Sequence, residues 1–391
     1  MKYAVTSMKT LALGLALSLI PSLTFAQHYK QTNLVSDTVG LAPTHDPSLI
    51  NPWGLTRSST TPSRPGSPWW VANNNSGTST LYDGSGNKIP INGNGIVTIP
   101  PPKGSTAAST PTGTVFYGGP DFIIPKSKGG NGLPAVFLFA TEDGTISAWN
   151  GGPSAVLILD NSDSGSPNGA VYKGLTTAQI NGKPYLYATN FRSGKVEVYD
   201  DSFNPVHFGS EQFDPGGDGD HDADDVNGET IPAGFAPFNI QNIGGSLFVT
   251  YAKQDAPRHD PVDGDGLGFV VIYTPSGHVI SHLQHGPWLN APWGVVWTPR
   301  DFGLYSNSIL VGNFRSGWIA AYNGFTGKFI DFVRNPDDSL VTIGSLWALA
   351  FGNNAGAGPS TTLFFTAGLE NEMHGLFGTL TPVDGLDGTV E

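Results

Sequence analysis

Short runs in which apolar and polar residues alternate recur along the whole chain, with glycine-rich turns between them. Typical pairs are YLYATN followed by KVEVYD, and SILVGN followed by WIAAY. Alternation with a period of two predicts β-strands with one buried face, and a Ser-Gly turn between two runs predicts a tight hairpin. Because no stretch shows the 3.6-residue period of an amphipathic helix, the pattern predicts an all-β protein.

The hairpins belong to a longer unit that occurs six times. Each copy has an opening with an aromatic residue, an apolar strand, a turn and a second strand that usually ends in Tyr or Trp. The copies recur at intervals of about 60 residues, a length that four short strands and their loops fill in a propeller blade. The repeat therefore predicts a six-bladed β-propeller in which each blade is a four-stranded antiparallel sheet. We place the six openings at Trp53, Phe116, Tyr172, Phe238, Trp293 and Trp347.

The N-terminal segment predicts export and closure of the ring. Lys2 and Lys9 precede an apolar stretch at 11–20, and a small-x-small site ends at Ala26, which is the pattern of a secretory signal peptide. We expect residues 1–26 to be removed and residues 27–391 to form one propeller domain, secreted or periplasmic. The run QTNLVSD is expected to complete the last blade as its outer strand, which closes the ring and hides a strand edge.

Composition narrows the choice of partners. The formal net charge is −13, which cleavage of the signal makes more negative, so nucleic acid and anionic membranes are not expected as partners. No later stretch has the roughly 20 apolar residues that a membrane-spanning helix needs. The chain has no cysteine, so its stability must come from core burial, calcium or both. We expect a monomer.

An acidic insertion at 214–229 suggests a calcium loop. Aligned from its first aspartate, it places acidic side chains at alternating positions and ends in a Glu that can bind Ca²⁺ through both oxygens. Ala223 stands where the sharp turn of such a loop needs glycine, and the alternative is a solvated acidic loop. The candidate metal ligands are Asp218, Asp220, Asp222, Asp224 and Glu229.

A second acidic loop, at 255–266, belongs to the same blade. Its aspartates could join the first loop around an ion, and His259 could bind a softer metal. A lone His without a second His at ligand spacing is also typical of an ordinary surface loop.

The pentapeptide NFRSG occurs twice, at 190–194 and 313–317. Its flanking strands and its glycine predict the same hairpin turn used in two blades. The alternative concerns Arg192 and Arg315, which occupy equivalent places and could bind an anionic ligand or blade carboxylates.

Several long motifs resemble a known group of proteins. INPWGL, FATEDGTISAWN, IPAGFAPFNIQNIGGSLFVTYAKQD and LFFTAGLENEMHGLFG occur in this order and are similar to motifs of an uncharacterised family of secreted bacterial propellers. The resemblance runs from about residue 33 to residue 380, with a more distant likeness to NHL and YVTN-type propellers. It implies the fold and export but supplies no activity. Many members end in a PEP-CTERM sorting tail, whereas this chain ends in TPVDGLDGTVE, so sorting of that kind is not expected.

The mouth of the central channel is the expected place for a site, because loops of several blades converge there. Glu372 and His374 are the candidate acid and base. In gluconolactonase-like propellers, Glu, Asp and Asn side chains of inner strands hold a divalent metal; Asn239 resembles such a ligand, although no inner-strand carboxylate pairs with it. The alternative is that the aromatic residues pack blade against blade and the Asn side chains cap turns. The candidate binding residues are Asn51, Trp53, Arg192, Asn239, Trp293, Arg315, Glu372 and His374.

Three functions remain open from sequence. The first is a binding or scaffolding module for a protein, glycan or surface polymer, stabilised by calcium if the acidic insertion binds it. The second is a metal-dependent hydrolase or lactonase with its site at the channel mouth. The third is a structural envelope or matrix protein. The chain lacks GxSxG, HExxH and GxxxxGK[ST] motifs and any thiol, so the enzymes that depend on those motifs have no support.

Overall fold

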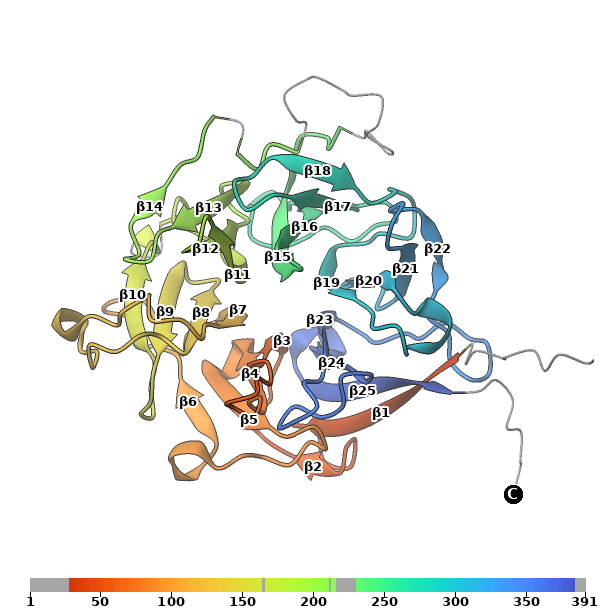
Figure 1. Ribbon diagram of the computed structural model, residues 1–391, viewed down its shortest axis with the longest axis horizontal. Coiled ribbons are helices and arrows are strands. Elements are labelled where there is room, and N and C mark those ends of the chain that lie inside the picture. The colour runs from red at the N-terminus through yellow and green to blue at the C-terminus, as the bar shows by residue number, and fades with distance from the viewer. Residues whose placement is uncertain (1–27, 164–165, 211, 216–229, 384–391) are drawn as a thin grey trace, which may run out of the picture.

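The protein folds into six antiparallel sheets arranged around one axis (Figure 1). A computed structural model describes residues 28–163, 166–210, 212–215 and 230–383. Each blade contains four strands, and the prediction of a six-bladed β-propeller is confirmed. The predicted signal peptide and residues 216–229 of the acidic insertion lie outside the described residues.

The first five blades each use four strands that follow one another along the chain, from the axis outward. In blade order these strands are β3 (Pro52–Thr56), β4 (Trp69–Asn73), β5 (Thr78–Tyr82), β6 (Ile96–Thr98); β7 (Pro111–Phe116), β8 (Phe137–Thr141), β9 (Thr145–Trp149), β10 (Val156–Asp160); β11 (Tyr172–Ile180), β12 (Lys183–Asn190), β13 (Lys195–Tyr199), β14 (Pro205–Val206); β15 (Phe235–Ile243), β16 (Ser246–Lys253), β17 (Gly268–Tyr273), β18 (Val279–His282); and β19 (Pro292–Trp297), β20 (Ser308–Asn313), β21 (Ile319–Asn323), β22 (Phe329–Phe332).

The sixth blade joins the two ends of the chain. It contains β23 (Leu346–Phe351), β24 (Leu363–Ala367), β25 (Leu376–Val383) and, as its outer strand, β1 (His28–Ser36), with β2 (Thr44–His45) paired to β1. β1 pairs with β25 in antiparallel register from His28↔Val383 to Ser36↔Leu376. The predicted closure of the ring by the N-terminal strand is therefore confirmed. The short helices are η1 (Asn74–Ser76), η2 (Ile91–Gly93), η3 (Lys126–Lys128), η5 (Gly303–Tyr305) and α1 (Leu369–Glu372).

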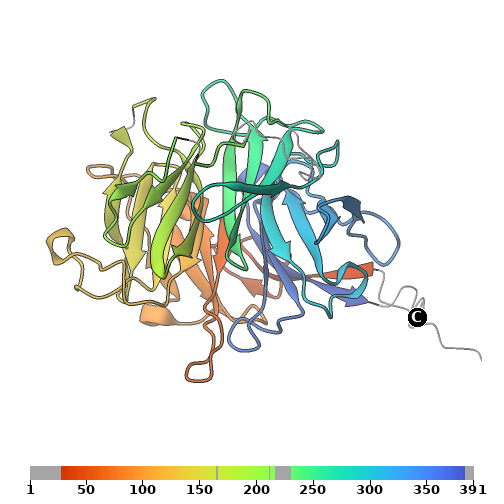
Figure 2. The same cartoon turned by 45° about the horizontal axis from the view of Figure 1, so that its top comes forward.

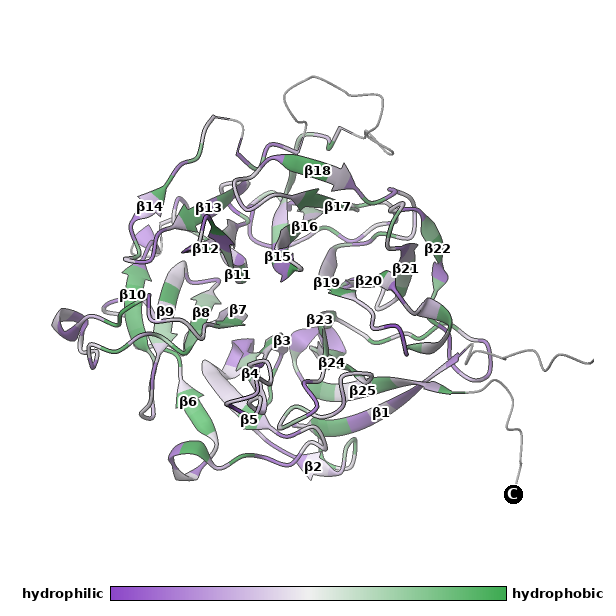
Figure 3. Cartoon of the chain, viewed as in Figure 1, coloured by the Kyte–Doolittle hydropathy of each residue, from purple (hydrophilic) through white to green (hydrophobic). Residues whose placement is uncertain are grey.

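Hydrophobic strand residues explain why the sheets pack face to face. In strands such as β10 and β18 the hydrophobic residues lie along the strand, whereas the connecting loops are more polar (Figure 3). The apolar faces of neighbouring sheets form buried clusters between blades, one of which includes Phe248, Val270, Val295 and Val311. In the part of the chain that the structure describes, no helix has the length and hydrophobicity to cross a membrane.

Every inner strand has a bulge near its start. In all six blades the register of the inner strand with its neighbour shifts directly after the first paired residues, as between Pro52 and Leu55 or between Tyr172 and Gly174. A bulge turns side chains away from the regular alternation. Because strands within a blade are antiparallel, the starts of the inner strands lie at the same end as the loops between the second and third strands. We call this end the mouth face; Figure 2 shows the loops gathered at the two ends of the strands.

Candidate functional site

An aromatic plug closes the axis just below the mouth face. Its main members occupy the same position in four blades. In each of these inner strands it is the residue that directly follows the pairs formed before the bulge. Trp347 stacks on Trp53 with ring centroids 3.5 Å apart and meets Trp293 edge-on at 5.9 Å. Phe238, from a blade two places away, is 6.0 Å from Trp347. These rings are almost completely buried, so Trp53 and Trp293, two of the candidate binding residues, are parts of a packed plug.

Two of the six repeated positions are not aromatic, and here the alignment of blade openings from sequence was wrong. The bulges place Thr112 and Lys173 at these positions, where sequence analysis placed Phe116 and Tyr172. Positions at which one copy of a repeat departs from the shared pattern are expected at functional sites. Lys173 is the more unusual of the two residues, because its side chain is completely buried.

Lys173 is held by two carboxylates that come from other blades. Its ammonium donates to Glu142 Oε1 and, at 3.3 Å, to Asp260 Oδ1. It also lies over the rings of Trp53 and Phe191, with 5.1 and 5.8 Å between Nζ and the ring centroids. A buried charge is costly unless it is paired, so these contacts hold the ammonium within the plug.

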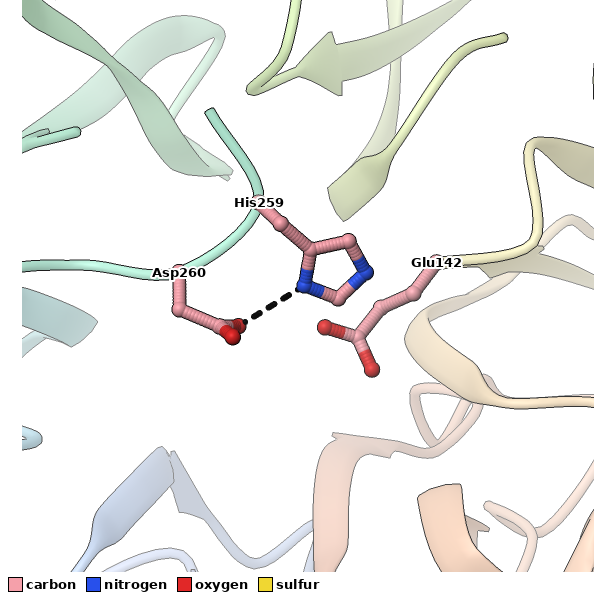
Figure 4. Close-up of side chains that lie close together, drawn as sticks. All are labelled: Glu142, His259 and Asp260. Carbon is pink, nitrogen blue, oxygen red and sulfur yellow. Dashed lines mark hydrogen bonds and ion pairs between the residues drawn. The ribbon is translucent and has the colours of Figure 1, made fainter. Parts of the chain in front are cut away.

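Glu142 lies in the tight turn between β8 and β9, which Gly144 completes with a φ of 82°. Its side chain points toward His259 and Asp260 (Figure 4). Asn74 donates to Glu142 Oε2 at 2.8 Å. The side chain of Glu142 is only 11% exposed. Glu142 and Lys173 were both missed as site residues from sequence.

His259 and Asp260 reach the same place from the long loop between β16 and β17 (Figure 4). His259 Nδ1 and Asp260 Oδ1 are 3.0 Å apart. Asn290 and Arg315 anchor this loop by donating to Asp263 Oδ1 at 2.7 Å and to the Pro261 carbonyl at 3.0 Å. The loop therefore carries two ionisable side chains over the axis.

Glu372 completes the group from the sixth blade. Asn51 donates to Glu372 Oε2 at 2.8 Å and accepts a bond from the indole of Trp347 at 2.9 Å. Glu372 ends a run in which Glu370, Asn371 and Glu372 have φ values of 52°, 56° and 70°. Among the described residues it is the only run of three successive non-glycine residues with left-handed φ. Such strain costs roughly 1–2 kcal/mol per residue and tends to occur at functional sites.

We call Glu142, Lys173, His259, Asp260 and Glu372 the mouth cluster. They come from the second, third, fourth and sixth blades, and the connecting loops around them share the mouth face. No local stretch of sequence brings them together, since only His259 and Asp260 are neighbours in the chain.

The surroundings of Glu372 and Asp260 shift the pKa values of these two carboxyl groups in opposite directions. Burial raises the pKa of Glu372, although Asn51 donates a hydrogen bond to it. The charges of Glu142 and Asp260 raise that pKa further, and the charge of Lys173 lowers it. Burial would also raise the pKa of Asp260, but the hydrogen bond from His259 and the charge of Lys173 outweigh burial and hold it well below its usual value. The bond to Asp260 in turn raises the pKa of His259.

Three of these side chains are placed as metal ligands are. One ligand atom each of Glu142, His259 and Asp260 lie within 4.8 Å of one another. One imidazole and two carboxylates suit divalent ions such as Zn²⁺ or Mn²⁺. The predicted calcium ligands of the acidic insertion lie outside the described residues, and that prediction stays a prediction.

The remaining candidate residues are not members of the mouth cluster, although Arg315 contacts the loop that carries His259 and Asp260. Asn239 donates to the Trp293 carbonyl at 2.8 Å and lines a small cavity one step farther along the inner strands, beyond the plug. Arg192 donates to the Gly169 carbonyl at 2.8 Å, and Arg315 bonds the Pro261 carbonyl. In each NFRSG turn the Phe enters the plug and the Arg bonds a main-chain carbonyl.

His374 ties the sixth blade to the segment after β1. Its Nδ1 is 2.9 Å from Asp37 Oδ2, and Asp37 Oδ1 accepts the Gly375 amide at 2.8 Å. The hydrogen bond to Asp37 and its negative charge raise the pKa of His374. His374 thus supports ring closure beside Glu372.

The His374 contact predicts a pH dependence of stability. A histidine whose folded pKa is raised stabilises the fold below its unfolded pKa, and this contribution is lost as pH rises through the folded value. We expect the melting temperature of the wild type to fall relative to His374→Gln as the pH rises from about 6.5, the usual pKa of histidine, through the raised pKa of His374. His278→Gln, at an exposed position, is the control and should follow the wild type. Equal pH profiles for His374→Gln and the wild type would contradict the contact.

Comparisons with known proteins identify relatives without assigning an activity. No protein-family model matches the chain. Two uncharacterised proteins of Acanthamoeba polyphaga mimivirus align over most of it: R648, 29% identical over 90% of this chain and 80% of its own length, and L690, 28% identical over 90% and 85%. A third, R640, is 32% identical, but the match covers 57% of this chain and only 39% of R640.

Among solved structures, the chain is similar to the α-L-arabinanase of Penicillium chrysogenum, solved in complex with arabinobiose. The TM-score is 0.52 at 12% identity, over 91% of this chain and 99% of the arabinanase. At this identity the likeness shows the propeller fold alone.

Proposed function

We propose that the protein is a hydrolase whose active site is the mouth cluster and whose substrate is a neutral, hydroxyl-rich molecule, with glycosides as the leading class. The observation that carries the proposal is the burial of Lys173 between Glu142 and Asp260 in an otherwise apolar plug. Packing alone does not require this arrangement, because aromatic residues fill the same position in four other blades.

The carboxyl groups supply the two roles that hydrolysis of a glycosidic bond needs. One group must give a proton to the leaving oxygen and another must take a proton from water or attack directly. Glu372, with its raised pKa, suits the proton donor. Asp260, held ionised by His259 and Lys173, suits the carboxylate that accepts a proton or stabilises positive charge. Paired carboxyl groups whose pKa values are pushed apart are typical of acid–base sites.

The charge of the site limits the substrate. Lys173 balances only part of the negative charge of the surrounding carboxylates, so anionic polymers are disfavoured. A neutral sugar can accept and donate hydrogen bonds to the same carboxylates and to Asn51 and Asn74. The α-L-arabinanase with a similar fold was solved with arabinobiose bound, and this likeness makes glycosides the first class to test.

The proposal predicts a large loss of activity when the proton donor is removed. After a panel of glycosides and lactones identifies a substrate, Glu372→Gln should lower kcat by about 10²–10⁴-fold. The variant should also lose the decline in rate at high pH that ionisation of Glu372 produces. Glu370→Gln is the matched control, because Glu370 lies in the same turn with its side chain 77% exposed. Unchanged turnover in Glu372→Gln, or equal losses in both variants, would refute this role.

A binding module without turnover is the second candidate. The observation that favours it is that Lys173 contacts both Glu142 and Asp260, which ties up carboxylates that a catalyst uses. A glycan, protein or surface polymer bound at the mouth without turnover, with affinity reduced by Asp260→Asn, would support this candidate. In either case we propose that the protein is exported, as the signal pattern at residues 1–26 indicates.

A further inference from the structure

We propose that Glu142, His259 and Asp260 form a site for a divalent transition-metal ion such as Mn²⁺ or Zn²⁺, and that the Lys173 ammonium competes with this ion for the same two carboxylates. The inference concerns the mouth cluster of the proposed hydrolase, but it does not require turnover. It assigns the metal to side chains of two hairpin loops, among them His259, which the sequence analysis named as a possible ligand of a softer metal, and not to Asn239 on the inner strand.

The first observation is the convergence of three different ligands from two blades. Their ligand atoms lie within 4.8 Å of one another (Figure 4), whereas ligand atoms bound to one tetrahedral ion at about 2.0–2.2 Å lie roughly 3.5 Å apart. Small side-chain rotations can close this gap, because His259 and Asp260 are partly exposed, with side-chain exposures of 38% and 56%. Three protein ligands leave coordination positions open for water or substrate, as in catalytic metal sites.

The second observation is the buried ammonium. The oxygens of Glu142 and Asp260 already hold one cation, Lys173, in a place with no solvent exposure for that lysine. The site is therefore built to stabilise positive charge. Among the described residues, no partner is recorded for the second ring nitrogen of His259. That nitrogen is available as a metal ligand if the ring turns.

Competition follows from electrostatics. An ion bound to Glu142 and Asp260 lies within a few ångströms of Lys173 Nζ, and two positive charges at that separation repel strongly in a buried site. Lys173 packs against Trp53 and Phe191 and has little room to withdraw. Metal binding must therefore displace the ammonium from these contacts, which weakens the affinity of the wild type.

The direct test measures Mn²⁺ and Zn²⁺ binding by titration calorimetry. Lys173→Met should bind one ion at least ten-fold more tightly than the wild type, and Lys173→Met/His259→Ala should lose that gain. Both variants also carry Asp220→Asn, Asp222→Asn and Asp224→Asn, as does the reference protein, so that the acidic insertion does not contribute. Equal affinities in the presence and absence of Lys173, or no effect of His259→Ala, would overturn the proposal.

A second measurement does not depend on the folding of Lys173→Met. Co²⁺ added to the protein with native Lys173 and His259 should produce a visible absorption band of a nitrogen-ligated ion. His259→Ala should lose the band. Glu372→Gln should keep it, since Glu372 is not a ligand, so metal binding and hydrolysis can fail independently. The same spectrum for His259→Ala and the protein with native His259 would also overturn the proposal.

Discussion

Lys173→Met is expected to lower the free energy of unfolding by about 3–5 kcal/mol at neutral pH, the usual loss when one partner of a buried ion pair is removed. Glu142, 11% exposed, is left without its cation inside the plug. Methionine has a similar length and keeps most of the contact with Trp53 and Phe191. The measurement is urea unfolding, with the midpoint and the slope compared between variants.

Two further variants separate the ion pair from packing. Asp260→Asn should cost less than Lys173→Met, because Asp260 is 56% exposed and solvent screens part of its charge, whereas the side chain of Lys173 is completely buried. In Lys173→Met/Glu142→Gln the uncompensated charge is removed, so this double variant should recover part of the loss. If Lys173→Met unfolds at the same urea concentration as the wild type, the buried pair does not stabilise the fold in the way argued.

Tyr29→Ala is expected to have an effect of similar size through a different cause, the closure of the ring. Tyr29 lies in β1 with no exposed surface. Its hydroxyl donates to the Phe302 carbonyl at 2.8 Å and accepts from the Tyr305 amide at 3.1 Å. Its ring lies 4.8 Å from that of Phe302 and 5.8 Å from that of Tyr305. The side chain therefore fastens the first strand to the fifth blade.

Truncation of a buried aromatic side chain typically costs about 3–5 kcal/mol. Loss of the hydroxyl alone leaves the buried Phe302 carbonyl and Tyr305 amide without this partner and costs about 1–3 kcal/mol. We expect Tyr29→Ala to unfold at a much lower temperature and Tyr29→Phe to unfold between Tyr29→Ala and the wild type. Freed from β1, β25 would present an open edge, which favours association between molecules. Light scattering during heating should show earlier aggregation for Tyr29→Ala alone. A wild-type melting curve for Tyr29→Ala would show that closure does not depend on this residue.

The architecture could be predicted from the sequence because it depends on hydrophobic and turn patterns that repeat along the chain. Six alternating hairpins with glycine turns define six blades, and the strand near the N-terminus was left over to close them. The two NFRSG turns have the same geometry, with Gly194 and Gly317 at φ values of 73° and 72°. Such features are local, so the chain reveals them within a few residues.

Only part of the mouth cluster could be predicted from the sequence, because its members contact one another across different blades. Glu142 resembles an ordinary turn residue in TEDG, and its meeting with Lys173 depends on the packing of two blades. The third blade opening was placed at Tyr172, one residue before Lys173, because an aromatic residue was expected at that position. Glu372 was recognised as a candidate acid, but its left-handed turn was not visible in the letters ENE.

The aromatic plug determines how a ligand can reach and leave the mouth cluster. Trp53, Trp293 and Trp347 contact one another across the axis. The central channel is therefore closed at the plug and open at the mouth face. Anything that reaches the mouth cluster must arrive and leave by the same opening. A long polymer could then be bound at an end or at an exposed loop but not threaded through, and in the proposed hydrolase each departing product would stand in the path of the next substrate molecule.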